Sequence, residues 1–266
     1  MKPFCPIPSK DGLPYIIAHR GLSVKFPENT LISFEKAANV LGVDMIELDV
    51  RLTKDGEVVV IHDHTLQRTT TGNGFVRNYL LKEIKQLDAG SWFHPSFSDQ
   101  RIPTLEEVLR LVGHKVWIDI ELKSDFFCRK RNGILERKVL DIVQKCSMNN
   151  RVLFSSFDHD MLINIKKMQP EARVGILYNF PFDFGKTPSE LAKKVDACVF
   201  VCSKREITYE MVRDAHKSSI AVYVYTLNSI SSVKRVMEYG VDGIMSDNAD
   251  EILNVIRQEK ITFVKN

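Results

Sequence analysis

Short apolar runs that alternate with amphipathic segments are the feature that most constrains the fold of this chain of 266 residues. The runs are typical of buried parallel strands, and the segments between them place apolar residues at helical spacing. We predict strands over residues 16–19, 45–50, 116–121, 152–155, 173–177, 197–201, 221–226 and 243–246. The helical segments between them include residues 30–41, 104–112, 134–146, 158–168, 209–217, 229–239 and 249–258. Eight such alternations predict a closed (β/α)₈ TIM barrel.

An open, doubly wound sheet is the alternative fold, but the glycine-rich phosphate fingerprint expected after its first strand is missing. The chain contains no linker, low-complexity tract or solenoid repeat. We therefore expect residues 1–266 to form a single domain.

The second and third predicted strands lie unusually far apart, starting at Met45 and Val116, whereas later strands start every 21 to 24 residues. The extra length runs from about Asp63 to Arg101. It includes a glycine-rich turn signal at residues 72–74 and several aromatic residues, namely Phe75, Tyr79, Trp92, Phe93 and Phe97. Because it leaves the carboxyl end of a barrel strand, we expect this insertion to cap the site.

Two acids stand on one face of the second predicted strand. Glu47 and Asp49 are two residues apart, so both side chains point the same way from an otherwise apolar run. Two carboxylates would repel each other in a dry core, and a divalent cation is the simplest compensation. Glu121, near the end of the third predicted strand, would complete a set of three oxygen ligands, which suits Mg²⁺ or Ca²⁺ better than zinc. Lys123 follows on the same face and adds positive charge for a phosphoryl group.

Two histidines end apolar runs in the same region. His19 closes the first predicted strand, and His62 follows residues 58–61, a run that we also interpret as a buried parallel strand. Two histidines at one barrel mouth suit a general acid and base near neutral pH. Arg20 offers a planar, permanently charged fork for phosphate oxygens. The Asp119 side chain points to the same face as that of Glu121, and we assign no role to it.

Composition limits the other possibilities. A net charge of +3 and a pI near 8.5 are too mild to indicate a nucleic-acid partner, and the basic cluster at residues 129–131 is expected to be a solvated loop. No run approaches the ~20 apolar residues of a membrane span, and the first residues lack the apolar core of a secretory signal. The cysteine count is odd and no CxxC occurs, which disfavours a disulfide framework or a zinc site: Cys5, Cys128, Cys146, Cys198 and Cys202. We expect a cytoplasmic protein.

The polar pieces belong to a longer series of motifs that runs over nearly the whole chain: His19-Arg20-Gly21, Pro27-Glu28-Asn29-Thr30, Glu47-Leu48-Asp49-Val50, Thr53-Lys54-Asp55-Gly56, His62-Asp63, Leu66-Gln67-Arg68-Thr69-Thr70, Ile102-Pro103-Thr104-Leu105, Glu121-Leu122-Lys123, Ser156-Phe157 and Gly240-Val241-Asp242-Gly243-Ile244. In content and order this series resembles the signature of glycerophosphodiester phosphodiesterases. The resemblance implies a capped TIM barrel, one bound divalent cation, and hydrolysis of a small glycerophosphodiester to glycerol 3-phosphate and an alcohol.

The resemblance also implies roles for individual residues. The metal ligands would be Glu47, Asp49 and Glu121, the acid–base pair would be His19 and His62, and the phosphate would meet Arg20 and Lys123. Glu28 would lie near the metal or the substrate hydroxyls, and Phe157 would contact substrate. Two motifs depart from the family pattern, at Tyr225-Thr226-Leu227-Asn228 and Ser246-Asp247-Asn248-Ala249. Tyr225 still supplies an aromatic wall, now with a hydroxyl. The remaining histidines are expected on the surface or in loops: His64, His94, His114, His159 and His216.

Two rival functions remain. The same chemistry on a lysophospholipid would use the aromatic residues of the insertion to grip an acyl chain. A non-catalytic barrel that binds phosphodiesters would have no need of both histidines beside a full ligand set. Oligomeric state, the choice between Mg²⁺ and Ca²⁺, the alcohol, the attacking group and the division of labour between the histidines are left open.

Overall fold

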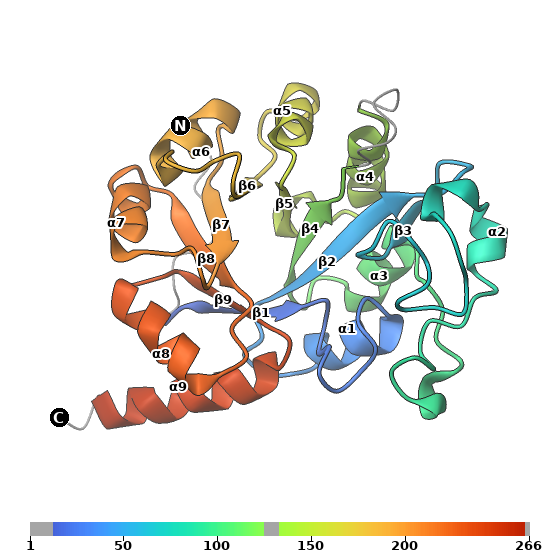
Figure 1. The fold of residues 1–266 in the computed structure, drawn as a ribbon, viewed down its shortest axis with the longest axis horizontal. Helices are drawn as coiled ribbons and strands as arrows, with labels where there is room; N and C mark the ends of the chain where they lie inside the picture. Colours follow the sequence, from blue (N-terminus) through green and yellow to red (C-terminus); the bar gives the residue numbers. More distant parts are fainter. Residues whose placement is uncertain (1–12, 125–132, 264–266) are drawn as a thin grey trace.

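A computed structural model describes residues 13–124 and 133–263 and has the predicted TIM-barrel fold (Figure 1). The eight barrel strands are β1 (Tyr15–His19), β2 (Met45–Leu52), β4 (Trp117–Leu122), β5 (Val152–Ser156), β6 (Val174–Leu177), β7 (Val199–Ser203), β8 (Ala221–Tyr225) and β9 (Gly243–Ser246). All neighbouring barrel strands are parallel, and β1 closes the barrel by pairing with both β2 and β9. The eight predicted strands are therefore confirmed.

Helices surround the barrel: α1 (Leu31–Ala38), α3 (Leu105–Val112), α4 (Ile134–Lys145), α5 (His159–Met168), α6 (Pro188–Val195), α7 (Tyr209–Lys217), α8 (Ile230–Tyr239) and α9 (Ala249–Phe263). The α6 helix was not among the predicted segments. Its start nevertheless carries a clear local signal, because the Thr187 side chain accepts from the backbone of Glu190 and Pro188 takes the first turn.

One strand prediction is wrong. Residues 58–60 form β3 (Val58–Val60), which pairs antiparallel with the far end of β2 and is not a parallel barrel strand. Only a short turn joins β2 to β3, whereas a parallel pair needs a crossover of a dozen or more residues. The turn and the antiparallel pairing bring the chain back beside β2, where the N–H of Ile61 donates to the carbonyl of Asp49. His62 therefore still arrives at the carboxyl ends of the barrel strands, which we call the mouth.

The barrel interior changes character along its axis because side chains alternate along each strand. The apolar interior is one buried cluster that includes Ile17, Met45, Leu153, Tyr223 and Met245. Two or four residues further along the same strands come polar groups: His19, Glu47, Asp49, Ser155 and Asp247. The outward-facing alternates pack against the helices in a separate, larger cluster. The reactive polar side chains therefore lie at the mouth, and apolar side chains fill the barrel interior below them.

The insertion after β3 has a small core of its own. It contains α2 (Leu81–Ile84) and two short 3₁₀ turns, and its apolar residues pack with those of β3. Trp92 contacts Phe93, which contacts Phe97, and Phe97 in turn meets Phe26 of the β1–α1 loop. Figure 1 shows this segment beside β3 and α1. Among the described residues, no helix combines the length and apolar character needed to cross a membrane.

Candidate active site

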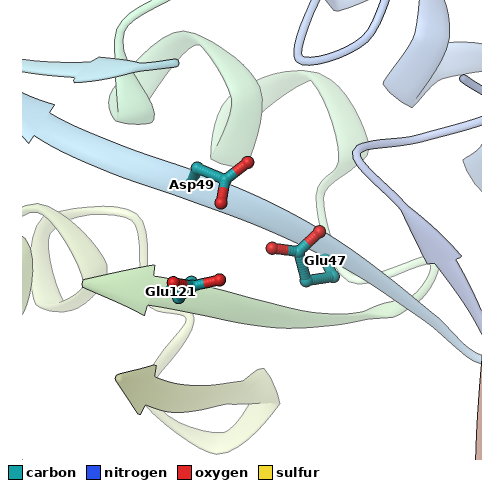
Figure 2. A group of neighbouring side chains, drawn as sticks. All are labelled: Glu47, Asp49 and Glu121. Atoms are coloured by element: carbon teal, nitrogen blue, oxygen red, sulfur yellow. The ribbon is translucent and has the colours of Figure 1, made fainter. Parts of the chain in front are cut away.

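The three predicted metal ligands lie together at the mouth. Glu47 and Asp49 come from β2, and Glu121 comes from the neighbouring β4, where it stands directly opposite Asp49 in the parallel register (Figure 2). One carboxylate oxygen from each lies within 4.8 Å of the others, and all three residues are buried. This spacing allows a single cation to contact all three carboxylates.

The positive charges of the protein do not fully neutralise the three carboxylates. Burial and the charges of neighbouring acids raise the pKa of Glu47 well above its usual range, and burial also raises the pKa of Glu121. In contrast, Lys123 and Arg20 hold the pKa of Asp49 below its usual range despite burial. The Oε1 of Glu47 is buried and has no hydrogen-bond partner. The donor set and this unpartnered oxygen fit a hard divalent cation.

Two cations border the acids. The Nζ of Lys123 lies 2.5 Å from Glu121 and 2.9 Å from Asp49. The guanidinium of Arg20 lies 3.3 Å from Asp49 and donates to Glu28 at 2.7 Å. The backbone of Arg20 adopts a left-handed conformation (φ 57°) that is uncommon for a residue with a side chain, and its N–H donates to Glu47. This strained backbone conformation is held by the contacts that place Arg20 beside the acids.

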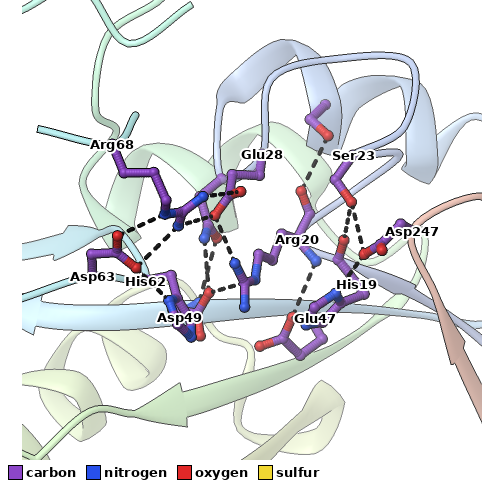
Figure 3. A network of polar contacts seen from close by, with 12 residues as sticks. His19, Arg20, Ser23, Glu28, Glu47, Asp49, His62, Asp63, Arg68 and Asp247 are labelled. Atoms are coloured by element: carbon purple, nitrogen blue, oxygen red, sulfur yellow. Dashed lines mark hydrogen bonds and ion pairs between the residues drawn. The ribbon is translucent and has the colours of Figure 1, made fainter. Parts of the chain in front are cut away.

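Each of the two histidines is oriented by a carboxylate (Figure 3). The Nδ1 of His19 is 2.6 Å from Asp247, and the Nδ1 of His62 is 2.7 Å from Asp63. When Nδ1 carries the proton that is donated to the carboxylate, the other ring nitrogen, Nε2, is left to exchange a proton. The Nε2 of His19 lies 3.8 Å from Glu47, so this nitrogen is directed at the acidic cluster.

The electrostatics of the His62 pair follow from its surroundings. Burial lowers the pKa of His62 to about 4, because the attraction of Asp49 does not offset burial and the positive charges of Lys123 and Arg20. Burial favours a higher pKa for Asp63, but hydrogen bonds from Arg68 and His62 outweigh it and hold this pKa below its usual range. The Asp63 carboxylate therefore stays charged and continues to accept from His62.

On the other side of the site, Asp247 is held by several donors. Ser23 donates to it at 3.1 Å and Asn228 at 2.6 Å, in addition to His19. These bonds lower its pKa to about 2 even though burial acts in the opposite direction. Asp247 is accordingly an anion at neutral pH with a fixed orientation toward His19.

The remaining predicted site residues occupy the rim. Glu28 joins Arg20 to Arg68, accepting from the latter at 2.7 Å. It also lines an open pocket with His62 and with Thr69 of the insertion. Phe157 and Tyr225 meet edge to face, with ring centroids 6.4 Å apart. Burial raises the pKa of the Tyr225 hydroxyl above its usual range, and the charges of Glu206 and Glu121 contribute.

Sequence reasoning assigned no role to several of these contacts. Asp63 directly follows His62, and Asp247 continues the inward-facing alternation of β9, so both carried a positional signal. Asn29 and Arg68 gave no such signal, because their partners depend on loop paths. Asn29 donates to Asp49 at 2.8 Å. Asp119 accepts from Ser155 at 2.7 Å and stands opposite Glu47 in the register of β2 and β4.

One further expectation needs correction, and others fall outside the described residues. His159 is not a surface residue: it starts α5 with only 10% of its side chain exposed and donates to the carbonyl of Leu177. The surface prediction was wrong because sequence alone does not show which side chains in the first turn of a helix pack against a neighbouring loop. The predictions for the basic cluster at 129–131, Cys5 and Cys128 lie outside the described residues.

Comparison with known proteins places this site in a family. A profile described as "Glycerophosphoryl diester phosphodiesterase family" matches residues 19–251. The chain belongs to this family. A glycerophosphodiester phosphodiesterase of Caldanaerobacter subterraneus subsp. tengcongensis is 40% identical over 91% of this chain and 98% of its own length. One from Bacillus altitudinis is 36% identical over 92% of this chain and 99% of its own.

Solved structures of family members share the fold. An Oleispira antarctica phosphodiesterase in complex with the product sn-glycerol-3-phosphate has a TM-score of 0.84 at 29% identity, covering 93% of this chain and 98% of its own. A glycerophosphodiester phosphodiesterase from Agrobacterium tumefaciens has a TM-score of 0.77 at 30% identity, covering 90% and 98%. The chain therefore shares the barrel architecture of this hydrolase family.

Proposed function

We propose that this chain is a metal-dependent glycerophosphodiester phosphodiesterase that releases glycerol 3-phosphate and an alcohol from a small, soluble substrate. The observation that carries the proposal is the convergence at one barrel mouth of three buried carboxylates and two carboxylate-oriented histidines. The product in the Oleispira antarctica complex supports the same reaction class.

Glu47, Asp49 and Glu121 would hold one divalent cation, Mg²⁺ or Ca²⁺, through their oxygens. Such a cation, when bound, supplies positive charge that polarises the phosphoryl group and offsets the repulsion among the three acids. The unpartnered Oε1 of Glu47 and the raised pKa values of Glu47 and Glu121 support this assignment.

The chain's own residues then perform binding and proton transfer. Arg20 and Lys123 neutralise charge on the phosphoryl oxygens, where it builds up in the transition state. One of His19 and His62 removes a proton from the attacking oxygen at its Nε2, and the other protonates the leaving alcohol. The attacking oxygen is that of water or the 2-hydroxyl of the substrate's glycerol, the latter by way of a cyclic phosphate.

The alcohol leaves toward the rim. Phe157 and Tyr225 form an aromatic wall at one side, and Glu28 reaches the pocket shared by His62 and the insertion. We infer that residues 63–101 cap this side and influence which alcohol is accepted, because Thr69 and Ala89 of the insertion line the same pocket.

The test is hydrolysis of glycerophosphocholine, followed by ³¹P NMR before and after thorough chelation. The expected result is glycerol 3-phosphate as the phosphorus product, with turnover lost on chelation and restored by Mg²⁺ or Ca²⁺. Phosphocholine as the product, or turnover that survives chelation, would reject the proposal. Tight binding of glycerophosphocholine without turnover would instead favour a non-catalytic phosphodiester-binding barrel.

A further inference from the structure

The loop between β6 and α6 carries an exposed aromatic surface that the hydrolytic site does not use. Its three phenylalanines lie within five residues, and Phe180, Phe182 and Phe184 are 56%, 72% and 74% exposed. Large apolar side chains gathered at one point of a surface mark an interaction site more often than scattered ones. We call residues 179–185 the Phe loop.

The Phe loop is held in this shape by a buried carboxylate. Asp183 is only 3% exposed and accepts from the backbone N–H of Asn179 at 2.9 Å and from the Nζ of Lys186 at 3.1 Å. Its own N–H donates to the carbonyl of Asn179 at 3.0 Å, and the half-buried His159 lies 3.5 Å from it. The polar groups of the loop thus turn inward and its phenylalanines turn outward. A built loop that presents three phenylalanines to water suggests a partner that relieves their exposure.

The Phe loop also lies at the mouth, because it follows the carboxyl end of β6, between the ends of β5 and β7 (Figure 1). The side-chain amide of Asn179 donates to the carbonyl of Phe157 at 3.4 Å. The Phe157 ring in turn meets that of Tyr225 edge to face. One hydrogen bond therefore joins the loop to the segment that carries the aromatic wall of the site.

The charges beside the loop are mixed, with an excess of cations. Lys186 ends the loop and pairs with Asp183. Lys204 and Arg205 follow β7 at the same rim, next to Glu206, and form no side-chain ion pair with another described residue. Aromatic side chains flanked by Lys and Arg suit the surface of a membrane with anionic phospholipids, since the rings enter the interface and the cations meet the head groups.

We propose that the Phe loop docks the barrel mouth onto a phospholipid bilayer by placing Phe180, Phe182 and Phe184 in its interface. The bilayer is the occupant that the exposed rings and the excess of cations favour, because a second copy of this chain would bring Lys204 and Arg205 against the same unpaired cations. The consequence for catalysis rests on the proposed function: docking would hold the mouth at the membrane surface while the small, soluble substrate still enters from water. Docking itself does not depend on that function.

The experiment is co-sedimentation of the full chain with phosphatidylcholine vesicles and with vesicles that also contain phosphatidylglycerol. We expect the wild type to bind, more strongly to the anionic vesicles, and a variant with Phe180→Ser, Phe182→Ser and Phe184→Ser to lose about tenfold or more in partitioning. The single variant Phe182→Ser should lose part of the binding. The matched control is Leu41→Ser, which removes an 85% exposed apolar side chain at the opposite end of the barrel and should bind as the wild type does.

Hydrolysis of soluble glycerophosphocholine separates the two proposals. The triple variant should keep the wild-type kcat/KM on this substrate, because its substitutions lie outside the hydrolytic site. Absence of hydrolysis by a wild type that binds vesicles would reject the proposed function and support docking. A wild type that does not sediment, or a triple variant that sediments equally well, would overturn docking. A dimer that the triple substitution dissociates, without vesicle binding, would overturn it in favour of self-association.

Discussion

Replacing Glu47 by Gln keeps the size of a buried side chain and removes one charge from the acidic cluster. Because the three carboxylates have oxygens within 4.8 Å of one another, two full charges there repel by about 3 kcal/mol or more at an effective dielectric constant of about 20. Arg20 and Lys123 offset part of this repulsion. At pH values above the raised pKa of Glu47, where this carboxylate is charged, we therefore expect the metal-free variant to be more stable than the metal-free wild type by about 1 kcal/mol, or roughly 2–4 °C in Tm.

The pH dependence of the folding stability tests the direction of this effect. The pKa of Glu47 is raised in the folded state, so the folded protein binds a proton that the unfolded chain releases near pH 4.3. The corresponding stability is fully present below that pH and is lost as the pH rises through the folded-state pKa. Metal-free wild type should accordingly lose stability as the pH rises above about 4.3, and the Glu47→Gln variant should lose less.

Metal binding should reverse the ranking of the two proteins. At a cation concentration of about 100 Kd the wild type gains about 2.7 kcal/mol, or roughly 5–10 °C in Tm. If removing one of three ligands weakens binding ~100-fold, the same concentration stabilises Glu47→Gln by only about 0.4 kcal/mol. Differential scanning calorimetry across a Mg²⁺ or Ca²⁺ titration measures both effects.

The matched control is Glu136→Gln. Glu136 is a buried carboxylate on α4 that accepts from Asn164 at 3.0 Å, away from the cluster. It should keep the full metal-induced shift in Tm. An equal metal shift in Glu47→Gln and the wild type would refute the assignment of Glu47 as a ligand. A metal-free Glu47→Gln variant that is less stable, with an unchanged pH slope, would refute the electrostatic reasoning.

Three further predictions concern catalysis and selectivity. Replacing His19 or His62 by Ala should lower kcat by ~10²-fold or more. The loss of kcat in the double variant should be far smaller than the product of the two single losses, since the pair acts as a unit. Wild-type turnover in a folded His62→Ala protein would reject the pair. Asp247→Asn should lower kcat about 10-fold or more with little change in KM, because it orients His19 rather than binding substrate; an effect on KM alone would contradict this role. When each aromatic residue of the insertion is replaced by Ala in turn, at least one change should alter kcat/KM unequally for glycerophosphocholine and glycerophosphoethanolamine, by an amount equivalent to ~0.5–2 kcal/mol for a lost cation–π contact; equal losses at every insertion aromatic would show that residues 63–101 only support the fold.

The barrel could be predicted from sequence because its signal is repeated eight times. An apolar run followed by a helical segment recurs along the chain, so neither an error at one boundary nor the unpredicted α6 changes the topology. The metal cluster could be predicted for a related reason. Residues two apart on a strand share a face, and Glu47, Asp49 and Glu121 needed only the adjacency of β2 and β4 to meet.

The parts that sequence did not reveal depend on loop paths. The direction of β3 follows from the short turn after β2, and apolar content alone does not show whether such a run is parallel or antiparallel. The exposed Phe loop contradicts the usual expectation that phenylalanines pack inside, and only its closure by Asp183 places them outside. The link from Glu28 to Arg68 joins segments 40 residues apart that no local pattern relates.

The most direct test of the proposed metal site is a crystal structure of the wild type soaked with Mn²⁺, as an anomalous scatterer in place of Mg²⁺, together with glycerol 3-phosphate. We expect one anomalous peak about 2.0–2.6 Å from oxygens of Glu47, Asp49 and Glu121, with the phosphate between that peak, Arg20 and Lys123. Anomalous density elsewhere, or none among these carboxylates while the phosphate is bound, would contradict it.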